Sequence, residues 1–139
     1  MNTHDARLTV STKHTYDAVN VTAEIDRALA GAGVEFGICL VSVPHTTCGI
    51  TVNEDEHGLV EDILRMSAEL LSPLAARKPF RHDHIDNNAQ AHLTSSLFGS
   101  SVAIPIRRGR LRLGTWQNVF LIECDGPRTR QVEITALGI

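Results

Sequence analysis

Hydrophobic and polar residues alternate near the start of the chain and then recur at helical spacing. The alternation over residues 6–12 predicts a half-buried strand. Between residues 21 and 32 the apolar positions have helical spacing, which predicts a short helix capped by Asn20 or Thr22. The Gly-Ala-Gly sequence at the end of this segment is a stop signal for the helix.

A continuous apolar run follows this helix. Residues 36–43 are apolar almost throughout, which predicts a central strand covered on both faces. Pro44 ends the run. The β-prone residues 46–52 predict a second strand or a bulged continuation of the first.

The pattern then becomes helical again. Residues 53–56, Asn-Glu-Asp-Glu, combine capping side chains with negative charge, as the N-terminus of a helix prefers. The helix after them is expected to end at Pro73, with residues 74–79 as a connection. Its apolar stripe consists of Val60, Ile63, Leu64, Leu70 and Leu71.

The last part of the chain is predicted to be one helix followed by strands. The helix covers residues 89–98, is capped by Asn87 or Asn88, and ends at Gly99. Short β-prone runs separated by glycine-containing turns then predict an antiparallel meander. These runs are 101–106, 110–113, 118–123 and 130–137. Residues 1–139 are therefore expected to form a single α+β domain with a β-rich, largely antiparallel core and about three helices.

Composition and charge narrow the range of functions. The net charge of −3 argues against non-specific nucleic-acid binding, and the basic residues at 107–112 are interpreted as a solvated turn. The chain has no signal-peptide pattern and no apolar run near the ~20 residues of a membrane span, so a cytoplasmic protein is expected. Its three cysteines include no Cys-x-x-Cys pair and suit a reducing compartment.

Candidate chemistry is densest between residues 82 and 92, which contain three of the seven histidines. His82, His84 and His92 are mixed there with Asp83 and Asp86. Neutral imidazole is the commonest protein ligand of zinc-like metals, and carboxylates can complete or orient the ligand set. The spacing matches no recognised ligand motif, so solvent-exposed capping residues are the alternative.

A second polar group follows the predicted strand 36–43. His45 comes directly after Pro44, where a strand end can hold it rigidly against a crevice. Taken alone, it fits a structural histidine better than a ligand, and the histidine-rich loop elsewhere in the chain brings the two interpretations level. Thr46 and the small residues after it permit close approach by a ligand, and Cys48 lacks an identifiable base that would make it a nucleophile.

Two further segments carry polar side chains. Asn53 and Glu54 begin the long helix, where capping explains them without any function. The segment Gly114-Thr115-Trp116-Gln117 holds the only tryptophan, which either plugs one end of the core or lies beside a ligand-binding amide. Ser101 belongs to a serine-rich stretch around Gly99 whose hydroxyl and N–H groups could hold an anion.

Taken in order, these motifs resemble those of the YjbQ family, whose members are often named secondary thiamine-phosphate synthase enzymes. The resemblance runs over essentially the whole chain. It rests on His45-Thr46-Thr47, Asn53-Glu54, the pattern from His82-Asp83 through Asp86 and Asn88-Ala89 to Ala91-His92, Gly99-Ser100-Ser101, Pro105 and Gly114-Thr115-Trp116-Gln117.

The resemblance implies an α+β fold assembled as a homotrimer, with the polar cluster near subunit boundaries. It also implies a metal site at His45, His82 and His92, with a zinc-like ion preferred and magnesium as the alternative. His84 falls at a position that the family pattern leaves variable. Cys48 replaces a residue that is often Ser or Ala, which makes an essential thiol less expected.

The activity implied by the resemblance is a transferase reaction that joins a pyrimidine pyrophosphate to a thiazole phosphate, giving thiamine phosphate, as a main or a side activity. One alternative is a metal-dependent hydrolase of a small phosphorylated or ester substrate, with Glu54 or Asp86 as the base. Another is a non-catalytic oligomeric protein that binds metal or a small molecule. Either enzyme would take a small phosphorylated molecule, and no nucleic acid or membrane is expected as a partner.

Each candidate residue then has an expected role. The expected metal ligands are His45, His82 and His92. The expected catalytic residues are Glu54, Asp86, Asn88 and Gln117. The expected substrate-binding residues are Thr46, Asn53, Ser101, Thr115 and Trp116.

Overall fold

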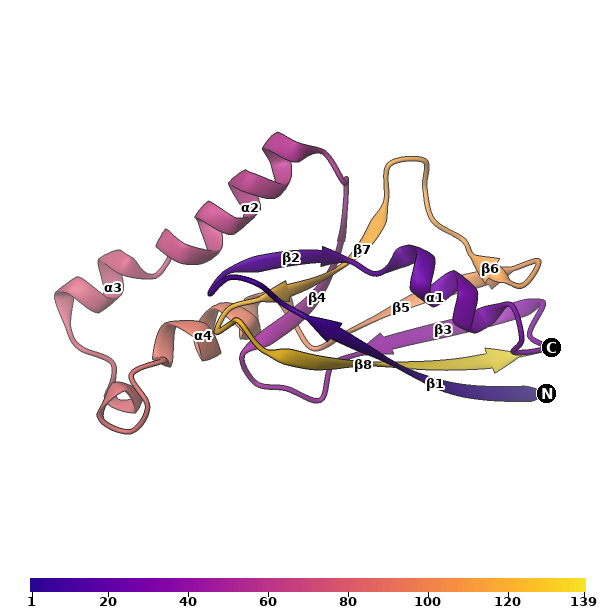
Figure 1. The fold of residues 1–139 in the computed structure, drawn as a ribbon, viewed down its shortest axis with the longest axis horizontal. Helices are drawn as coiled ribbons and strands as arrows, with labels where there is room; N and C mark the ends of the chain where they lie inside the picture. Colours follow the sequence, from indigo (N-terminus) through magenta and orange to yellow (C-terminus); the bar gives the residue numbers. More distant parts are fainter.

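The computed structural model describes all 139 residues and contains two antiparallel sheets and four α-helices (Figure 1). The larger sheet has the strand order β1-β8-β3-β5-β6 and the smaller one the order β2-β7-β4. The strands are β1 (Asn2–Ser11), β2 (Asp17–Asn20), β3 (Phe36–Ser42), β4 (Cys48–Asn53), β5 (Ser101–Arg107), β6 (Arg110–Leu111), β7 (Asn118–Glu123) and β8 (Thr129–Gly138). The helices are α1 (Thr22–Leu29), α2 (His57–Glu69), α3 (Ser72–Arg77) and α4 (Ala89–Phe98), with a 3₁₀ turn η1 (Arg81–His84) before α4.

The predicted α+β class with a largely antiparallel core is confirmed, whereas the predicted meander is wrong. Of the strands that follow one another after α4, only β5 and β6 pair with each other, because β7 crosses into the smaller sheet and β8 returns to the larger one. By alternating between the two sheets, the chain places apolar side chains from both of them in one core that lies between the sheets. That core contains 17 buried residues drawn from α1 and from strands of both sheets.

Strand β7 is the strand that is covered on both faces. Val119 and Leu121 point into the core between the sheets, whereas Phe120 and Ile122 point to a second cluster beneath α2 and α4. Strand β3 was predicted to have this position, and it is covered on one face only. Its side chains Phe36, Ile38 and Leu40 remain 48%, 55% and 41% exposed on the outer face of the larger sheet.

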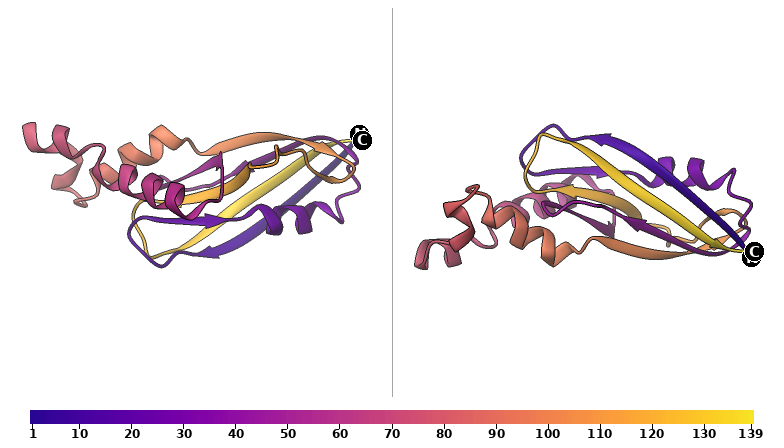
Figure 2. Two further views of the ribbon diagram at one scale, coloured as in Figure 1. Left: turned by 90° about the horizontal axis from the view of Figure 1, so that it is seen from above. Right: turned by 90° about the horizontal axis from the view of Figure 1, so that it is seen from below.

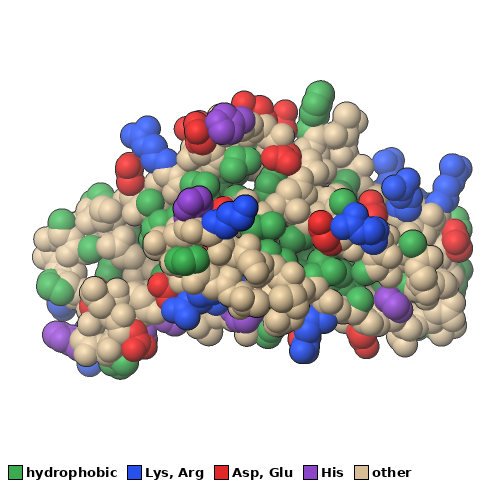
Figure 3. All heavy atoms as spheres, in the orientation of Figure 1, with side chains coloured by type: hydrophobic (Ala, Val, Ile, Leu, Met, Phe, Trp, Pro, Cys, Tyr) green, Lys and Arg blue, Asp and Glu red, His purple; other side chains and the backbone are tan.

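The helical half of the molecule also departs from prediction. Pro73 does not close the long helix but lies in the first turn of α3, where its missing N–H costs no hydrogen bond. Residues 74–79 are therefore largely helical rather than a connection. The α2–α3 arm extends beyond the sheets (Figures 1 and 2), and Figure 3 shows apolar side chains on the surface over α3. Of the predicted apolar stripe on α2, only Ile63 is buried, and Leu70 is 49% exposed.

Capping is confirmed at α2 and corrected at α4. The Glu56 carboxylate accepts hydrogen bonds from the N–H groups of Gly58 and Leu59, so the acidic segment does begin the helix. At α4 neither Asn87 nor Asn88 caps through its side chain. The carboxylate of Asp83 accepts from the N–H of Ala89 instead, at 2.9 Å, which leaves the Asn88 amide free for other partners.

Helix α4 is held against β4 by a position that only glycine fits. A Cβ atom at Gly49 would lie 2.7 Å from Cβ of Phe98 and 2.8 Å from the carbonyl oxygen of Gly99. We therefore expect Gly49→Ala to lower the free energy of unfolding by about 1–3 kcal/mol, as overpacking does. Urea denaturation would measure it. The open Gly31, where an added Cβ meets nothing within 4 Å, is the control, and an equal cost at both positions would contradict the packing described.

Candidate functional site

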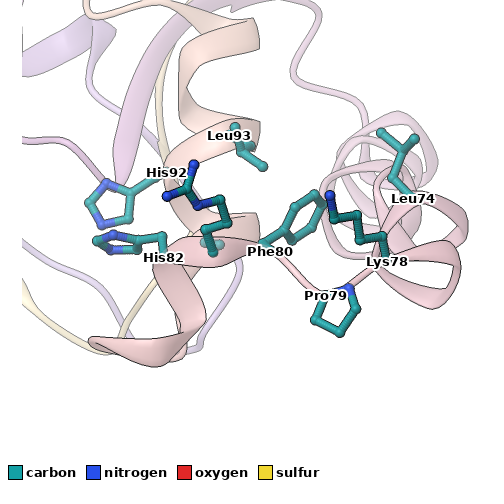
Figure 4. Close-up of a pocket in the computed structure, with 9 residues that line it drawn as sticks. Leu74, Lys78, Pro79, Phe80, His82, His92 and Leu93 are labelled. Carbon is teal, nitrogen blue, oxygen red and sulfur yellow. The ribbon is translucent and has the colours of Figure 1, made fainter.

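The turn η1 and the start of α4 bring His82 and His92 together. Their ring centroids are 4.6 Å apart and their planes meet at 79°, an edge-to-face arrangement (Figure 4). The turn folds back far enough for this because Asp83 caps α4 and so ties η1 to the start of the helix. The sequence prediction that this loop folds His82 back towards His92 is confirmed.

A chain of hydrogen bonds fixes the tautomer of His82. Arg128 and the Asn88 amide NH₂ both donate to the Asp125 carboxylate, each at 3.1 Å. The carboxylate can only accept, so the amide oxygen of Asn88 must face His82, whose Nε2 lies 3.1 Å away. Nε2 is therefore the protonated nitrogen of neutral His82. Its other nitrogen, Nδ1, keeps a free lone pair that can bind a metal ion or accept a proton.

His45 is held by a different interaction. Its Nε2 accepts a hydrogen bond from the backbone N–H of Gln131, 2.9 Å away. Burial lowers the pKa of His45 below 6.5, and the nearby Arg130 guanidinium lowers it further. His45 is thus neutral at pH 7, with its proton on Nδ1. In this state it offers a hydrogen-bond donor and no lone pair for a metal.

His45 should accordingly titrate below pH 6.5, which two-dimensional NMR of the imidazole carbons would measure. The pKa of His45 is lower in the folded protein than in the unfolded chain, where it is about 6.5. His45 therefore contributes to the free energy of unfolding at pH values above 6.5. The contribution is lost as the pH falls from 6.5 through the lower folded value. Replacing the exposed His57 is the control for stability. A His45 resonance titrating at or above 6.5 would contradict the burial of this ring beside Arg130.

A polar cavity of about 380 Å³ lies between His45 and His92, and its walls come from three segments. His82 does not line this cavity and contacts its wall through Asn88. The segment before β4 contributes Pro44, His45, Thr46 and Thr47, the start of α4 contributes Asp86, Asn88 and His92, and the turn into β8 contributes Asp125, Arg128 and Arg130. The lining has two arginines and two aspartates, and one of the arginines, Arg130, is already paired with Glu123 beneath the cavity. An anionic ligand would therefore gain little attraction unless a further cation joins it.

The floor of this cavity is a buried ion pair. Arg130 donates from Nε to the Glu123 carboxylate at 2.9 Å and from Nη2 to the Thr47 hydroxyl at 2.7 Å. The side chains of Arg130 and Glu123 are 6% and 0% exposed. Glu123 also accepts from the hydroxyl of Thr12 and from the N–H groups of Cys124 and Asp125. This network ties β7 and β8 to the loop that carries His45.

Four of these residues, Glu123, Asp125, Arg128 and Arg130, were not among the sequence-predicted candidates. Asp125 was interpreted only as part of a turn, and Arg128 was assigned no role. A signal for Arg130 was present, because it shares the inward face of β8 with Val132, Ile134 and Ala136. A charged residue on a buried strand face needs a buried partner, and Glu123 at the end of β7 was a candidate for that partner.

The remaining predicted residues lie elsewhere. Asn53 and Glu54 are at the far end of β4, where Asn53 pairs with Asn118, and the turn Gly114–Gln117 leads into β7 beside them. Trp116 is 71% exposed and does not plug the core, and Gln117 accepts from the N–H of Gly114. Ser101 is exposed at the start of β5 and does not line the polar cavity. His84, in η1, is exposed and does not line it either.

Cysteine chemistry finds no support in the structure. Burial raises the pKa of Cys48 to about 11 and that of Cys124 to about 12, so both thiols stay protonated at neutral pH. Neither residue lines the polar cavity. None of the helices has both the length and the apolar content that a membrane span requires.

The metal-binding prediction can be compared with this geometry. No group of three or more His, Cys, Asp or Glu side chains in the chain is arranged to hold a metal ion. His82 and His92 fit two ligand positions, since Nδ1 of His82 is free and its other nitrogen contacts an oriented amide, as metal-bound histidines require. His45 does not act as a third ligand in this conformation, because its Nε2 lone pair accepts the N–H of Gln131. A single chain thus brings together two of the three predicted ligands and no complete ligand set.

Comparisons with known proteins agree on one family. A family model described as UPF0047 protein YjbQ-like matches residues 6–139. The chain belongs to the YjbQ/UPF0047 family. It is 42% identical over 130 residues to a UPF0047 protein of Archaeoglobus fulgidus, covering 94% of this chain and 98% of that one. It is 36% identical over 135 residues to the UPF0047 protein YugU of Bacillus subtilis, covering 94% and 97%.

Solved structures of family members have the same fold. A YbjQ-like protein of unknown function from Sulfolobus solfataricus superposes with a TM-score of 0.92 at 38% identity, covering 99% of this chain and 98% of that one. A hypothetical protein from Aeropyrum pernix gives 0.90 at 40% identity, covering 98% and 99%. Membership of the YjbQ family, expected from the motifs, is confirmed, and these relatives' names specify no activity.

Proposed function

We propose that this protein is a metal-assisted enzyme acting on a small phosphorylated molecule, with the polar cavity between His45 and His92 as its active site. The hydrogen-bond chain from Arg128 through Asp125 and Asn88 to His82 carries this proposal. It orients one imidazole, with a free Nδ1, beside a second one. A solvated cap would need no such orientation.

The charge balance of the cavity supports a metal ion as the missing component. Two arginines and two aspartates line it, so a divalent, zinc-like ion at His82 and His92 would make the cavity attractive to a phosphoryl group. Magnesium is the less expected alternative because it prefers oxygen ligands. When bound, such an ion supplies electrostatic stabilisation to a phosphate or pyrophosphate oxygen.

The residues of the chain itself divide the remaining tasks. Nδ1–H of His45 donates to a substrate oxygen, and Thr46 is placed to do the same at the cavity rim. Arg128, whose side chain is 53% exposed, stabilises negative charge on the phosphoryl group, and buried Arg130 holds the loop of His45 and Thr46 in place through Thr47. His92, which has no hydrogen-bonded ring partner, is free to bind metal or to move a proton.

The reaction that we propose first is the transfer of a pyrimidine-methyl group from its pyrophosphate to the ring nitrogen of a thiazole phosphate, as in thiamine-phosphate synthesis. The bond from the methylene carbon to pyrophosphate breaks, a carbon–nitrogen bond forms, and pyrophosphate is released. Incubating the zinc-loaded protein with both substrates and assaying thiamine phosphate tests it, with His92→Ala as the inactive comparison. Product from the parent protein alone supports the transferase. No product from either protein, at any metal loading, contradicts it.

Metal-dependent hydrolysis is the second candidate, and the position of Asp86 favours it. Asp86 is an exposed carboxylate without an ion pair that lines the same cavity as His92, so it can act as a base towards water. Glu54 lies at the other end of β4 and cannot do so within one chain. Hydrolysis of phosphate esters or lactones without a second organic reactant would distinguish this activity from transfer.

We also propose that the chain assembles as a homotrimer. The outer face of the larger sheet supports this, because Phe36, Ile38 and Leu40 of β3 lie beside Leu137 of β8 and together leave a large apolar patch exposed. A patch of this kind on a single chain marks an interaction surface.

Placing a charge in this patch should therefore dissociate the trimer. We expect Ile38→Lys to reduce the mass in solution from three chains to one chain of 15.2 kDa, measured by light scattering after gel filtration. Ile85→Lys, at an exposed residue in the turn before α4, should leave the mass unchanged. A parent protein that is already monomeric would contradict the assembly.

A further inference from the structure

An apolar cavity and an exposed turn lie at opposite ends of the same pair of strands, β4 and β7. Strands β4 and β7 pair from Cys48 and Glu123 at the histidine end to Asn53 and Asn118 at the other. Five residues of antiparallel strand span about 17 Å. The turn Gly114–Gln117 therefore cannot reach the histidines of its own chain, and Figure 1 shows it projecting away from α4.

The first feature is an apolar cavity of about 500 Å³ beside the histidine pair. Its wall is formed largely by Leu74 of α3, Leu93 of α4 and Phe80, which lies between these helices. One side is closed by His82 and His92 (Figure 4). Leu74 and Leu93 are 52% and 42% exposed there. The cavity therefore exposes apolar surface that a partner could cover.

The rim of this cavity is basic. Lys78 and Arg81 line it, and neither takes part in any of the ion pairs of the structure. Uncompensated cations around an apolar depression favour an occupant that is apolar at its tip and acidic at its base.

The second feature is the segment that has this chemistry. Trp116, the only tryptophan, is 71% exposed in a turn that the Gly114–Gln117 hydrogen bond keeps in shape. Glu54 lies at the neighbouring end of β4 and has no ion pair. An exposed tryptophan on a constrained turn is a typical interface anchor, because little side-chain entropy is lost when it docks.

We propose that Trp116 of a second copy of this chain inserts into the apolar cavity beside His82 and His92. Its indole packs against Phe80 and Leu93, and Glu54 approaches Lys78 and Arg81. The same docking brings Gln117 of that copy to the histidine pair, so each active site is built from two chains. The docking is independent of which reaction the site performs, and its test measures the tryptophan rather than activity.

The single tryptophan makes the proposal directly measurable. In the assembled protein, Trp116 fluorescence should be blue-shifted relative to a free tryptophan amide and weakly quenched by acrylamide. Leu93→Arg should shift the emission to that of exposed tryptophan, although Leu93 is remote from Trp116 within one chain. Leu97→Arg, one turn further along α4 and 65% exposed, lies outside the cavity and should leave the emission unchanged. Solvent-like emission from the parent protein, or equal effects of the two variants, overturns the proposal.

Cross-linking keeps the proposal testable if Leu93→Arg does not fold. Chains carrying Thr115→Cys and Lys78→Cys are co-expressed and treated with a short bismaleimide, since the three native cysteines are buried. A covalent dimer of one chain of each kind, absent when either variant is expressed alone, is the expected result. No such dimer in the mixture overturns the docking, whatever activity the protein has.

Discussion

Replacing Glu123 with glutamine should lower the free energy of unfolding by about 3–5 kcal/mol, the largest stability effect that we expect from a single polar substitution. The change leaves Arg130, whose side chain is 6% exposed, as a buried charge without its partner. It also weakens the acceptor for Thr12 and for two backbone N–H groups. Urea denaturation monitored by circular dichroism would measure the loss.

A double-mutant cycle separates the pair from its surroundings. Arg130→Met alone should also destabilise the protein strongly, whereas Glu123→Gln with Arg130→Met should cost clearly less than the sum of the two. Arg7 and Glu133 form an exposed pair across β1 and β8, and the same cycle there should give only about 0–1 kcal/mol. Additive losses at Glu123 and Arg130 would show that the buried contact contributes no coupling.

The buried pair also predicts how the protein responds to acid. Burial by itself would raise the pKa of Glu123, but hydrogen bonds from Arg130 and Thr12 and from the backbone overcome it, so the pKa lies below 4.5. A carboxyl group with a lowered folded pKa stabilises the protein above its unfolded value. Stability should therefore fall as the pH drops below 4.5 through the folded value, and this part of the loss should be absent in Glu123→Gln.

The second large effect is expected at Asn88. Asn88→Ala should weaken binding of a zinc-like ion by about 10–100-fold, as loss of an outer partner of a metal-bound histidine does. The alanine cannot accept from Nε2 of His82 or donate to Asp125, so the orientation and tautomer of His82 are no longer fixed. Competition with a chromogenic chelator would measure the affinity.

Gln90→Ala provides the matched control, since Gln90 lies on the same turn of α4 and its side chain makes no hydrogen bond in the structure. It should bind the metal as the parent protein does. Equal affinities for the parent, Asn88→Ala and Gln90→Ala would mean that the hydrogen-bond chain does not serve metal binding.

Local patterns predicted most of the elements because local chemistry determines them. The helix over 89–98 and the strand over 118–123 were predicted with the boundaries that α4 and β7 have, since Gly99 and the flanking turns mark their ends. The outer face of β3 was not predicted. An apolar run indicates that a strand is to be covered but does not tell whether its own chain or another copy covers it.

The candidate site was predicted in part for a similar reason. His82 and His92 lie close in sequence, so a loop returning to a helix was enough to pair them. Asp125 and Arg128 come from a turn far along the chain, and only the crossing of β7 and β8 between sheets brings them to Asn88. The expected role of His45 as a ligand rested on residue type, which cannot reveal that the N–H of Gln131 binds its Nε2.

The most direct test of the account is the metal content of tag-free protein, measured by elemental mass spectrometry for the parent, His82→Ala and His92→Ala. His57→Ala is the control, because His57 is exposed on α2 and pairs only with Glu61. The account predicts a stoichiometric zinc-like ion in the parent and in His57→Ala, and its loss from both of the other variants. A folded parent protein that neither contains nor takes up metal would contradict it, as would metal that persists without His82 and His92.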